Sequence, residues 1–310
     1  MIKNLTSLFL VWLIIVLRIR FFTLIERKVL GYLQTRKGPN KVGIIGIFQP
    51  FRDAIKLFRK ESVILINSNQ LVFIISPGFI FIFRLLLWRL YFRFSPVYLF
   101  EYGIIFFLRI SSLRVYTTLI AGWASNSKYA FLGGLRGVAQ TISYEIRASF
   151  LILSVIIFFY SFNFFFLIFN INFRSLLFYF PLFILWLIRI LAETNRTPFD
   201  FVEGESELVR GFNVEYSSEL FVLLFIAEYL NILFVSIITR IIFIPNLNFW
   251  GIEIFFFTLF FSYIFIHIRG SLPRIRYDCL IGFCWKVSLP LTLFFLFFRL
   301  LSFSFLRYIF

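Results

Sequence analysis

The sequence predicts an all-α protein that crosses a membrane several times, and its composition carries this prediction. Hydrophobic residues make up 61% of the 310 residues, aromatic residues alone make up 23%, and the mean hydropathy is +0.92. A soluble globular chain contains roughly 45–50% apolar residues, glycine included. Fifty phenylalanines cannot be hidden inside one soluble core of this length, and apolar segments recur at the length that spans a bilayer. We therefore expect a single membrane domain over residues 1–310.

About eight spans are expected, near residues 5–25, 71–92, 102–122, 148–169, 176–192, 219–239, 252–268 and 287–306. A spanning helix needs about 20 apolar residues, and the fifth and seventh segments are short by that measure. The loops after odd-numbered spans contain 18 Lys and Arg residues, whereas the even loops and the termini contain five. Positive loops stay on the negative side of a membrane, so the odd loops should face the cytoplasm or the mitochondrial matrix. Positive loops also explain the net charge of +16, so no nucleic-acid binding is expected.

The first odd loop, residues 26–61, contains a turn and a predicted amphipathic helix. Residues 37–40, K-G-P-N, are a strong turn signal. Apolar residues from 48 to 58 keep helical spacing beside charged ones, which predicts a short helix at the membrane interface. Three lysines of this loop are typical of contacts with lipid headgroups, namely Lys41, Lys56 and Lys60. Acid and base alternate beside the first span, which favours a polar site there, at Glu26, Arg27 and Asp53.

The second odd loop, residues 123–147, places polar side chains on one face of a predicted helix. Arg136, Gln140, Tyr144 and Glu145 follow steps of four, four and one residues, so they line much of one helix face. Glu145 should face protein or water, because exposing a carboxylate to lipid is prohibitively costly. Small residues in the same loop permit close packing of helices, namely Gly133, Gly134 and Gly137.

The stretch from Leu191 to Tyr229 contains eight of the chain's 15 acidic residues, although its surroundings are apolar. Carboxylates in apolar surroundings resist ionisation, so they can hold or relay protons near neutral pH. The stretch is therefore a candidate proton-handling site. Its acids are Glu193, Asp200, Glu203, Glu205, Glu207, Glu215, Glu219 and Glu228.

Cysteine and histidine indicate no metal site. Cys279 and Cys284 have no second pair nearby, and His267 is the only histidine in the chain. Zinc and iron–sulfur sites need more ligands than these residues provide. All three side chains are expected to be packing residues.

Long motifs in the four odd loops resemble one protein family. They read E-R-K-V-L-G-Y-L-Q-T-R-K-G-P-N-K-V-G, G-W-A-S-N-S-K-Y-A-F-L-G-G-L-R, A-E-T-N-R-T-P-F-D-F-V-E-G-E-S-E-L-V and P-R-I-R-Y-D. In this order, over nearly the whole chain, they resemble the chain 1 family of NADH-ubiquinone oxidoreductase. That family is the mitochondrially encoded membrane subunit of respiratory complex I. The Phe-rich spans are similar to those of invertebrate members.

The resemblance implies a function and a set of site residues. Such subunits form the membrane side of the ubiquinone-reduction chamber, and they begin the buried charge path that couples quinone reduction to proton translocation. By motif position, the residues near the quinone correspond to Arg27, Arg36, Arg136, Arg196, Arg276, Asp200, Glu203, Glu205 and Glu207. The proton path corresponds to Glu26, Asp53, Tyr144, Glu145, Glu193, Glu215 and Glu228.

The resemblance also implies a substrate, partners and a location. Ubiquinone is the substrate, whereas NADH, FMN and iron–sulfur clusters bind only to partner subunits. The expected partners are the quinone-site subunits of the peripheral arm, the proton-path subunits of the membrane arm, and lipids that include cardiolipin. The protein would be a multi-pass protein of the mitochondrial inner membrane with its odd loops in the matrix, active only within its complex.

Eight arginines depart from the family pattern. Six lie within apolar spans, where an arginine costs about 2.5–3.5 kcal/mol on insertion, and no predicted span carries matching acids. The chain also contains only one Met. One hypothesis explains both facts: the sequence was translated with the wrong mitochondrial code, so that serine codons appear as Arg and methionine codons as Ile. The eight are Arg18, Arg20, Arg84, Arg109, Arg114, Arg147, Arg189 and Arg210.

Alternatives remain open on the sequence alone. The arginines are instead real if they line water or bind cardiolipin, and CGN codons at these positions would exclude mistranslation. Glu219 also departs from the family, and no role is assigned to it. Other functions to weigh are the equivalent subunit of a membrane-bound hydrogenase, a secondary transporter for an organic cation or proton, and a pure scaffold. A transporter should move solute alone in liposomes, and quinone binding separates the expected function from a scaffold.

Overall fold

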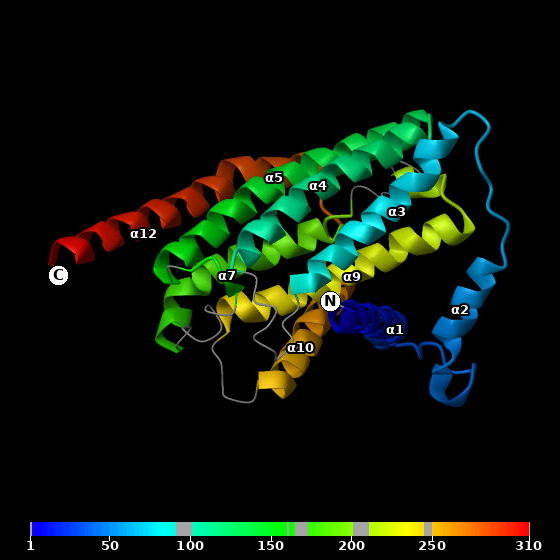
Figure 1. Cartoon of the computed structure of the whole chain (residues 1–310), viewed down its shortest axis with the longest axis horizontal. Helices are drawn as coiled ribbons and strands as arrows, with labels where there is room; N and C mark the ends of the chain where they lie inside the picture. The colour runs from blue at the N-terminus through cyan, green and yellow to red at the C-terminus, as the bar shows by residue number, and fades with distance from the viewer. Residues whose placement is uncertain are drawn as a thin grey trace.

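The computed structural model describes residues 2–90, 101–159, 161–164, 173–200, 211–244 and 250–309. Across these residues the chain is helical and contains no strand, which confirms the all-α prediction. Figure 1 shows the long helices packed into a bundle. The helices are α1 (Ile2–Leu33), α2 (Gln49–Phe58), α3 (Gln70–Leu87), α4 (Gly103–Ala124), α5 (Lys128–Phe159), α7 (Phe173–Glu193), α9 (Ser218–Phe243), α10 (Trp250–Ser271), α11 (Tyr277–Phe283) and α12 (Leu289–Ile309). Shorter turns are η1 (Ile44–Gly46), η2 (Trp88–Leu90), η4 (Gly211–Val214) and a π-helical turn, η5 (Cys284–Ser288), that joins α11 to α12.

Every predicted span overlaps one of the described helices, namely α1, α3, α4, α5, α7, α9, α10 and α12. Five described segments are long and apolar enough to cross a membrane: Gln70–Leu90, Gly103–Ala124, Lys128–Ile157, Ser218–Phe243 and Tyr277–Ser302. A shorter apolar segment, Phe255–Ser271, lies within α10. These segments confirm a polytopic membrane protein, while the total of eight spans stays a prediction.

One predicted span boundary was wrong, because α5 begins at Lys128 instead of near residue 148. The last span agrees with its prediction near 287–306, since α12 begins at Leu289, and the short α11 and η5 precede it. A hydropathy pattern marks only the apolar part of a helix, and polar turns continue α5 toward the odd-loop side. The polar residues between 136 and 145 therefore share one helix with the fourth span, as their spacing predicts.

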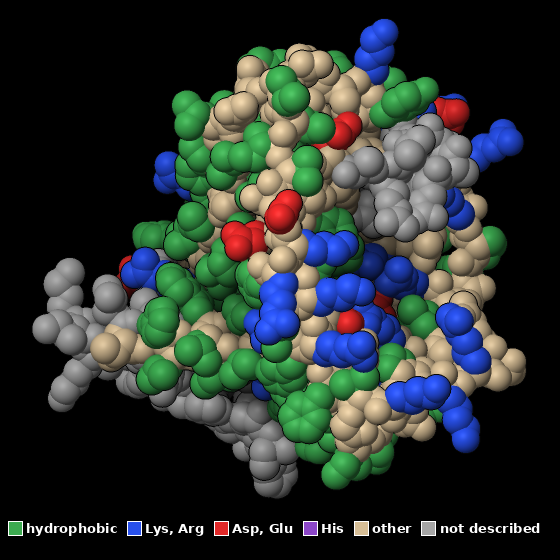
Figure 2. Space-filling model, turned by 90° about the vertical axis from the view of Figure 1, so that its right-hand side faces the viewer, with side chains coloured by type: hydrophobic (Ala, Val, Ile, Leu, Met, Phe, Trp, Pro, Cys, Tyr) green, Lys and Arg blue, Asp and Glu red, His purple; other side chains and the backbone are tan. Residues whose placement is uncertain are grey.

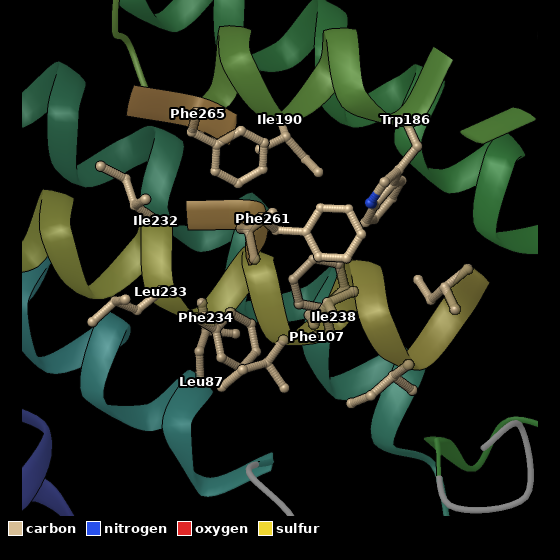
Figure 3. Close-up of a cluster of buried hydrophobic side chains, with 14 of the residues drawn as sticks. Leu87, Phe107, Trp186, Ile190, Ile232, Leu233, Phe234, Ile238, Phe261 and Phe265 are labelled. Carbon is tan, nitrogen blue, oxygen red and sulfur yellow. The ribbon is translucent and has the colours of Figure 1, made fainter. Parts of the chain in front are cut away.

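α9 forms the centre of the bundle. Every residue from Tyr229 to Phe243 is buried, as expected of a helix that is apolar on all sides. α3 and α10 pack directly against α9, and α4 packs against both α3 and α5. Figure 3 shows side chains of α3, α4, α7, α9 and α10 meeting in one core, among them Leu87, Phe107, Trp186, Phe234 and Phe261.

The outer helices keep apolar surfaces that the bundle does not cover. α12 packs along α5, and its C-terminal part extends past the other helices (Figure 1). Phe294, Phe297 and Phe298 on α12 are each more than half exposed. α1 contacts α2, α9 and α10. Such surfaces are suited to lipid or to neighbouring subunits.

α4 and α5 approach each other closely at two glycines. A Cβ on Gly122 would lie 3.1 Å from the Ala130 carbonyl oxygen and 3.2 Å from the Gly134 Cα. Close backbone contact through small residues is a common way of packing helices in membranes, where dispersion forces replace the hydrophobic effect. The prediction of a close helix contact is therefore confirmed for Gly134.

α2 is the short amphipathic helix that the spacing of residues 48–58 predicts. Phe48, Ile55 and Phe58 are each more than half exposed. The ring of Phe51 instead packs against Phe21 of α1, with 5.8 Å between ring centroids. α2 is thus attached to the first helix and presents apolar side chains outward, an arrangement suited to the membrane interface.

Candidate functional site

Buried and partly buried polar side chains form two clusters beside α9, inside a mostly apolar bundle. The Glu26 cluster consists of Glu26, Arg196, Glu228, Tyr229 and Arg269. The Glu193 cluster consists of Arg84, Arg114, Glu145, Arg189, Glu193 and Asn231. α9 supplies Glu228 to the first cluster and Asn231 to the second. Residues three apart lie on the same face of a helix, so the two clusters adjoin along α9.

Glu26 of α1 is buried although it carries a carboxylate. Its two oxygens have separate partners. The Tyr229 hydroxyl donates to Oε2 at 2.6 Å, and the Arg269 guanidinium donates to Oε1. Burial of a carboxylate is tolerated only when its oxygens are paired in this way. These contacts attach α1 to both α9 and α10.

Arg196 lies beside this pair. Its Nη2 is 3.4 Å from Oε2 of Glu228, and its central carbon lies 4.9 Å from the centroid of the Tyr229 ring. A guanidinium over an aromatic face is attracted by the ring, with about 0.5–2 kcal/mol of stabilisation. A continuous row of contacts therefore runs from Glu228 to Glu26, and its carboxylates are the groups that can hold a proton.

The turn after α7 determines where Arg196 lies. α7 ends at Glu193, and Asn195 adopts a left-handed conformation with a φ of 50°. Asparagine tolerates this conformation better than most residues. The Phe199 amide then donates to the Arg196 carbonyl at 2.9 Å, which closes a tight turn. The A-E-T-N-R-T-P-F motif thus specifies a helix end and a turn with Arg196 on it.

The connection between α10 and α11 holds the same segment from another side. The Ile275 amide donates to the Pro198 carbonyl at 3.2 Å, and the Arg274 guanidinium donates to the Asp200 carbonyl. The P-R-I-R-Y-D motif and the start of the acidic loop are therefore packed together, which the sequence alone did not indicate.

Three arginines converge on Glu193. Arg114 Nη1 lies 2.9 Å from Oε1, Arg84 Nη1 lies 3.8 Å from the same oxygen, and Arg189 Nη2 lies 2.8 Å from Oε2. Arg114 also lies 3.7 Å from Glu145. The expectation that no acid matches these arginines was wrong for all three. It failed because α5 and α7 continue past the predicted spans and carry both acids into the bundle.

Several polar atoms of the Glu193 cluster have no hydrogen-bond partner within the described part of the chain. The cluster holds three guanidinium groups and two carboxylates. Nε and Nη1 of Arg189 and Nε of Arg84 are buried and have no hydrogen-bond partner among the described residues. Each unmade hydrogen bond of a buried group costs about 1–3 kcal/mol, and more when the group is charged.

Arg147 is fully buried without an acid within ion-pair distance among the described residues. Its Nη1 donates to Ser288 Oγ at 2.8 Å, and its guanidinium stacks over the Tyr144 ring at 4.5 Å. Nε and Nη2 have no hydrogen-bond partner in the described residues. Three more of the arginines that depart from the family pattern are described. Arg18 and Arg20 lie over phenylalanine rings, and Arg109 is exposed.

Tyr216 anchors the chain after the acidic loop. Its ring stacks on Phe73 of α3, with 4.3 Å between centroids. Its hydroxyl lies 3.1 Å from Ser76 Oγ and donates to the Ala121 carbonyl at 3.3 Å. Burial raises the pKa of Tyr216 to about 12, so the hydroxyl keeps its proton for donation. The preceding Glu215 is half-buried.

Arg27 and Arg136 lie nearer the surface. Arg27 pairs with Asp53, which also accepts a hydrogen bond from Gln49 at 2.9 Å. The side chains of Arg27 and Asp53 are 54% and 32% exposed, so their pairing contributes at most about 1 kcal/mol. Arg136 is half-buried, with its guanidinium 5.7 Å from the Tyr277 ring centroid.

The end of the molecule near α2 is rich in basic side chains. Figure 2 shows Lys and Arg gathered around a hollow on this face, with a few acidic side chains among them. The first odd loop contains an open pocket of about 520 Å³, lined by residues 37–42, Gln49 and Arg52. Arg36 in this loop and Arg276 before α11 are exposed. Basic surfaces of this kind attract anionic partners or lipid headgroups.

Sequence comparison identifies the family. A profile described as NADH dehydrogenase matches residues 5–300. The chain belongs to the NADH dehydrogenase family. Three relatives carry the name NADH-ubiquinone oxidoreductase chain 1. The protein of Aedes aegypti is 51% identical over 281 residues, covering 90% of each chain. That of Anopheles gambiae is 51% identical over 290 residues, covering 90% of this chain and 89% of its own. That of Locusta migratoria is 50% identical over 285 residues, covering 92% and 90%.

Membership of the NADH dehydrogenase family confirms the resemblance seen in the loop motifs, and the structure groups some of the residues predicted from it. It brings together Glu26, Arg196 and Glu228 in one cluster, Glu145 and Glu193 in the other, and Arg27 with Asp53. Outside these groups lie Arg36, Arg136, Arg276, Asp200, Tyr144 and Glu215. Outside the described residues lie Glu203, Glu205, Glu207 and Arg210.

The sequence prediction missed several polar residues of this NADH dehydrogenase family member. Tyr229 and Arg269 complete the pairing of Glu26, and Arg240 forms a buried pair with Glu253 at 3.0 Å. Tyr229 directly follows Glu228, and Arg269 directly follows the predicted span 252–268. Their closeness to these predicted positions is the only feature of the sequence that could have pointed to them. Cys279 is exposed and Cys284 is buried. Within the described residues, no group of three His, Cys, Asp or Glu side chains could hold a metal ion.

Proposed function

We propose that this chain is the core membrane subunit of a proton-pumping NADH:ubiquinone oxidoreductase. In this proposal it forms the membrane side of the chamber where ubiquinone is reduced, and it begins the buried charge path that couples reduction to proton translocation. We infer the enzyme from the name of its relatives, which is NADH-ubiquinone oxidoreductase chain 1. The Glu26 cluster is the observation that carries the site, because it links acids, bases and a phenol from α1, the turn after α7, α9 and α10 in a mostly apolar bundle.

The proposed chamber residues suit the chemistry of a quinone. A quinone has an apolar tail and a polar head, so its path needs apolar walls with a few polar groups. Guanidinium groups can donate to the quinone oxygens, and carboxylates can supply the two protons that reduction to quinol consumes. These roles are proposed for Arg27, Arg36, Arg136, Arg196, Arg276, Asp200, Glu203, Glu205 and Glu207.

The proposed proton path begins where the acidic stretch meets the bundle. Quinone reduction changes the charge of the acidic loop, and that change biases the neighbouring carboxylates. Glu228 is well suited to respond, since it is partly exposed and paired with Arg196. The path is proposed to include Glu26, Asp53, Tyr144, Glu145, Glu193, Glu215 and Glu228.

The proposal includes partners and an orientation. NADH, FMN and the iron–sulfur clusters belong to partner subunits of the peripheral arm, and the continuation of the proton path belongs to partner subunits of the membrane arm. The chain lies in the mitochondrial inner membrane with its odd loops toward the matrix, in keeping with their positive charge. Lipids, cardiolipin among them, contact the basic first loop and α2.

Photoaffinity labelling tests the proposed chamber. A quinone analogue is photolysed in native membranes, and the labelled peptides are identified by tandem mass spectrometry. We expect label within residues 27–60 or 193–215 that excess ubiquinone competes away. Label found only on neighbouring subunits would contradict the chamber and leave this chain as a scaffold or a proton path.

A further inference from the structure

Gln140 makes two hydrogen bonds that span a turn far away in the sequence. Its side chain is fully buried within α5. Nε2 donates to the Ala192 carbonyl at 2.9 Å and to the Phe199 carbonyl at 3.2 Å. One amide group therefore joins both ends of the turn that follows α7. The spacing of residues 136–145 placed Gln140 on a polar helix face, but no role in binding or proton transfer was assigned to it.

Both carbonyls need such a donor. Ala192 lies in the last turn of α7, where helix carbonyls have no intrahelical partner. The Asn195 amide approaches it only at 3.4 Å, so Gln140 is its closer donor. Phe199 is buried as well, and a buried carbonyl without a donor costs about 1–3 kcal/mol. Gln140 therefore stabilises the turn in this position by donating to both of its ends.

The opposite side of the turn is held by a different element. Thr197 Oγ1 donates to the Arg269 carbonyl at 3.2 Å, and the Ile275 amide donates to Pro198 at 3.2 Å. The turn thus lies between α5 and the end of α10, attached to each. Removing the Gln140 contacts frees one side while the other stays attached, so the turn is expected to tilt without unfolding.

Arg196 would move with the turn. It lies between the two residues that Gln140 contacts, and its guanidinium is 3.4 Å from the Glu228 carboxylate. That distance is already at the outer limit of a hydrogen bond, so a shift of about 1 Å would break the contact.

We propose that Gln140 is a positioning residue, which fixes the turn from Ala192 to Phe199 and thereby holds Arg196 against Glu228. This inference rests on the proposed function, because Arg196 is one of its proposed chamber residues and Glu228 is one of its proposed proton-path residues. Gln140 acts through the turn and has no contact with substrate. The chemistry requires a donor with two hydrogens at the end of a long side chain, which an amide supplies.

The test compares four variants in the assembled complex. Gln140→Leu removes the donor and keeps similar bulk. Gln140→Glu keeps the shape but donates only when protonated, and then with a single hydrogen. Arg196→Gln removes the side chain that Gln140 is proposed to position. Thr141→Val is the matched control, since Thr141 is also buried on α5 but its hydroxyl donates only within the helix, to Val138 at 3.0 Å.

The measurement is quinone reduction with a short-chain ubiquinone, normalised to NADH oxidation by an artificial acceptor. We expect Gln140→Leu and Arg196→Gln to raise the KM for the quinone about tenfold, with kcat within about twofold, as expected for loss of about 1.4 kcal/mol of binding. Thr141→Val should behave like the unaltered chain. The Gln140→Glu defect should grow from about pH 6 to about pH 8, because its donor is lost as it ionises. A purely structural role would instead lower the yield of assembled complex and leave the KM for the quinone unchanged.

Three results would overturn the inference, and they can be told apart. An unchanged KM in Gln140→Leu with a raised KM in Arg196→Gln would remove the positioning role and leave the proposed function intact. An unchanged KM in both would remove the proposed quinone-side role of Arg196 as well. If Gln140→Leu does not assemble, the pH dependence of Gln140→Glu decides: a flat profile would overturn the role.

Discussion

The Tyr229 hydroxyl donates a hydrogen bond to the Glu26 carboxylate at 2.6 Å, although 203 positions separate the two residues in the sequence. A hydrogen bond of this length to a charged oxygen is about twice as strong as a neutral one. It joins the end of α1, where the E-R-K motif lies, to the centre of α9. The first odd loop and the acidic stretch therefore contribute to one site.

Replacing Tyr229 with Phe should weaken this link while leaving the fold intact. The ring would stay beneath Arg196, and Arg269 would still pair with Glu26. We expect quinone reduction to fall about ten- to a hundredfold, corresponding to the roughly 1.5–3 kcal/mol that a hydrogen bond to a charged group contributes. The measurement is the quinone reduction rate per assembled complex. Tyr263→Phe is the control, because Tyr263 on α10 is exposed, and equal rates in both variants would contradict the role of Tyr229.

Alanine substitutions at Gly122 and Gly78 should have opposite effects on stability, although both glycines lie in apolar helices. Gly122→Ala places a methyl group 3.1 Å from the Ala130 carbonyl oxygen, whereas Gly78→Ala meets nothing within 4 Å. We expect Gly122→Ala to destabilise the α4–α5 contact by about 1–3 kcal/mol. Gly78→Ala should be neutral or stabilising by about 0.5–1 kcal/mol, since alanine favours helix. Thermal denaturation of the complex measures both, and equal melting temperatures would contradict the close contact.

Features that depend on local sequence could be predicted, and features that depend on tertiary packing could not. The apolar spans, the α2 helix and the polar face of α5 follow from composition and helical spacing, which are properties of neighbouring residues. The partners of Glu26 come from α9 and α10, far away in the chain, so no spacing rule finds Tyr229 or Arg269. The boundaries of α5 failed because a polar helical turn resembles a loop in a hydropathy pattern.

The role of Glu193 could not be predicted from local sequence either, because its charge environment depends on tertiary packing. Its place in the acidic stretch made it a candidate proton carrier, but packing surrounds it with Arg84, Arg114 and Arg189. With arginine at all three positions, three guanidinium groups compensate one carboxylate and would make it a fixed counter-ion, which argues against Glu193 in the proposed proton path. Serine side chains at the same three positions would leave it able to exchange protons. The chemistry of Glu193 therefore depends on the identity of its neighbours.

We predict serine in the mature protein at the buried departing positions, including 147 and 189. Arg147 and Arg189 are fully buried, and several of their nitrogens have no hydrogen-bond partner among the described residues. An arginine inside a membrane costs about 2.5–3.5 kcal/mol even before that loss. Tandem mass spectrometry of peptides that cover these positions gives the residue masses directly. Arginine masses would show that the cation-rich Glu193 cluster is real, and would remove Glu193 from the proposed proton path.

Glu228 is the residue on which the proposed coupling depends most, because it is partly exposed and joins Arg196 at the start of the path. The most direct measurement compares Glu228→Gln with Glu219→Gln in sealed membrane vesicles, recording proton uptake and NADH:ubiquinone turnover together. Both residues lie on α9, but Glu219 is exposed in its first turn. The account predicts that Glu228→Gln lowers proton uptake at least about tenfold while Glu219→Gln pumps normally. Normal pumping by Glu228→Gln would contradict the proposed charge path.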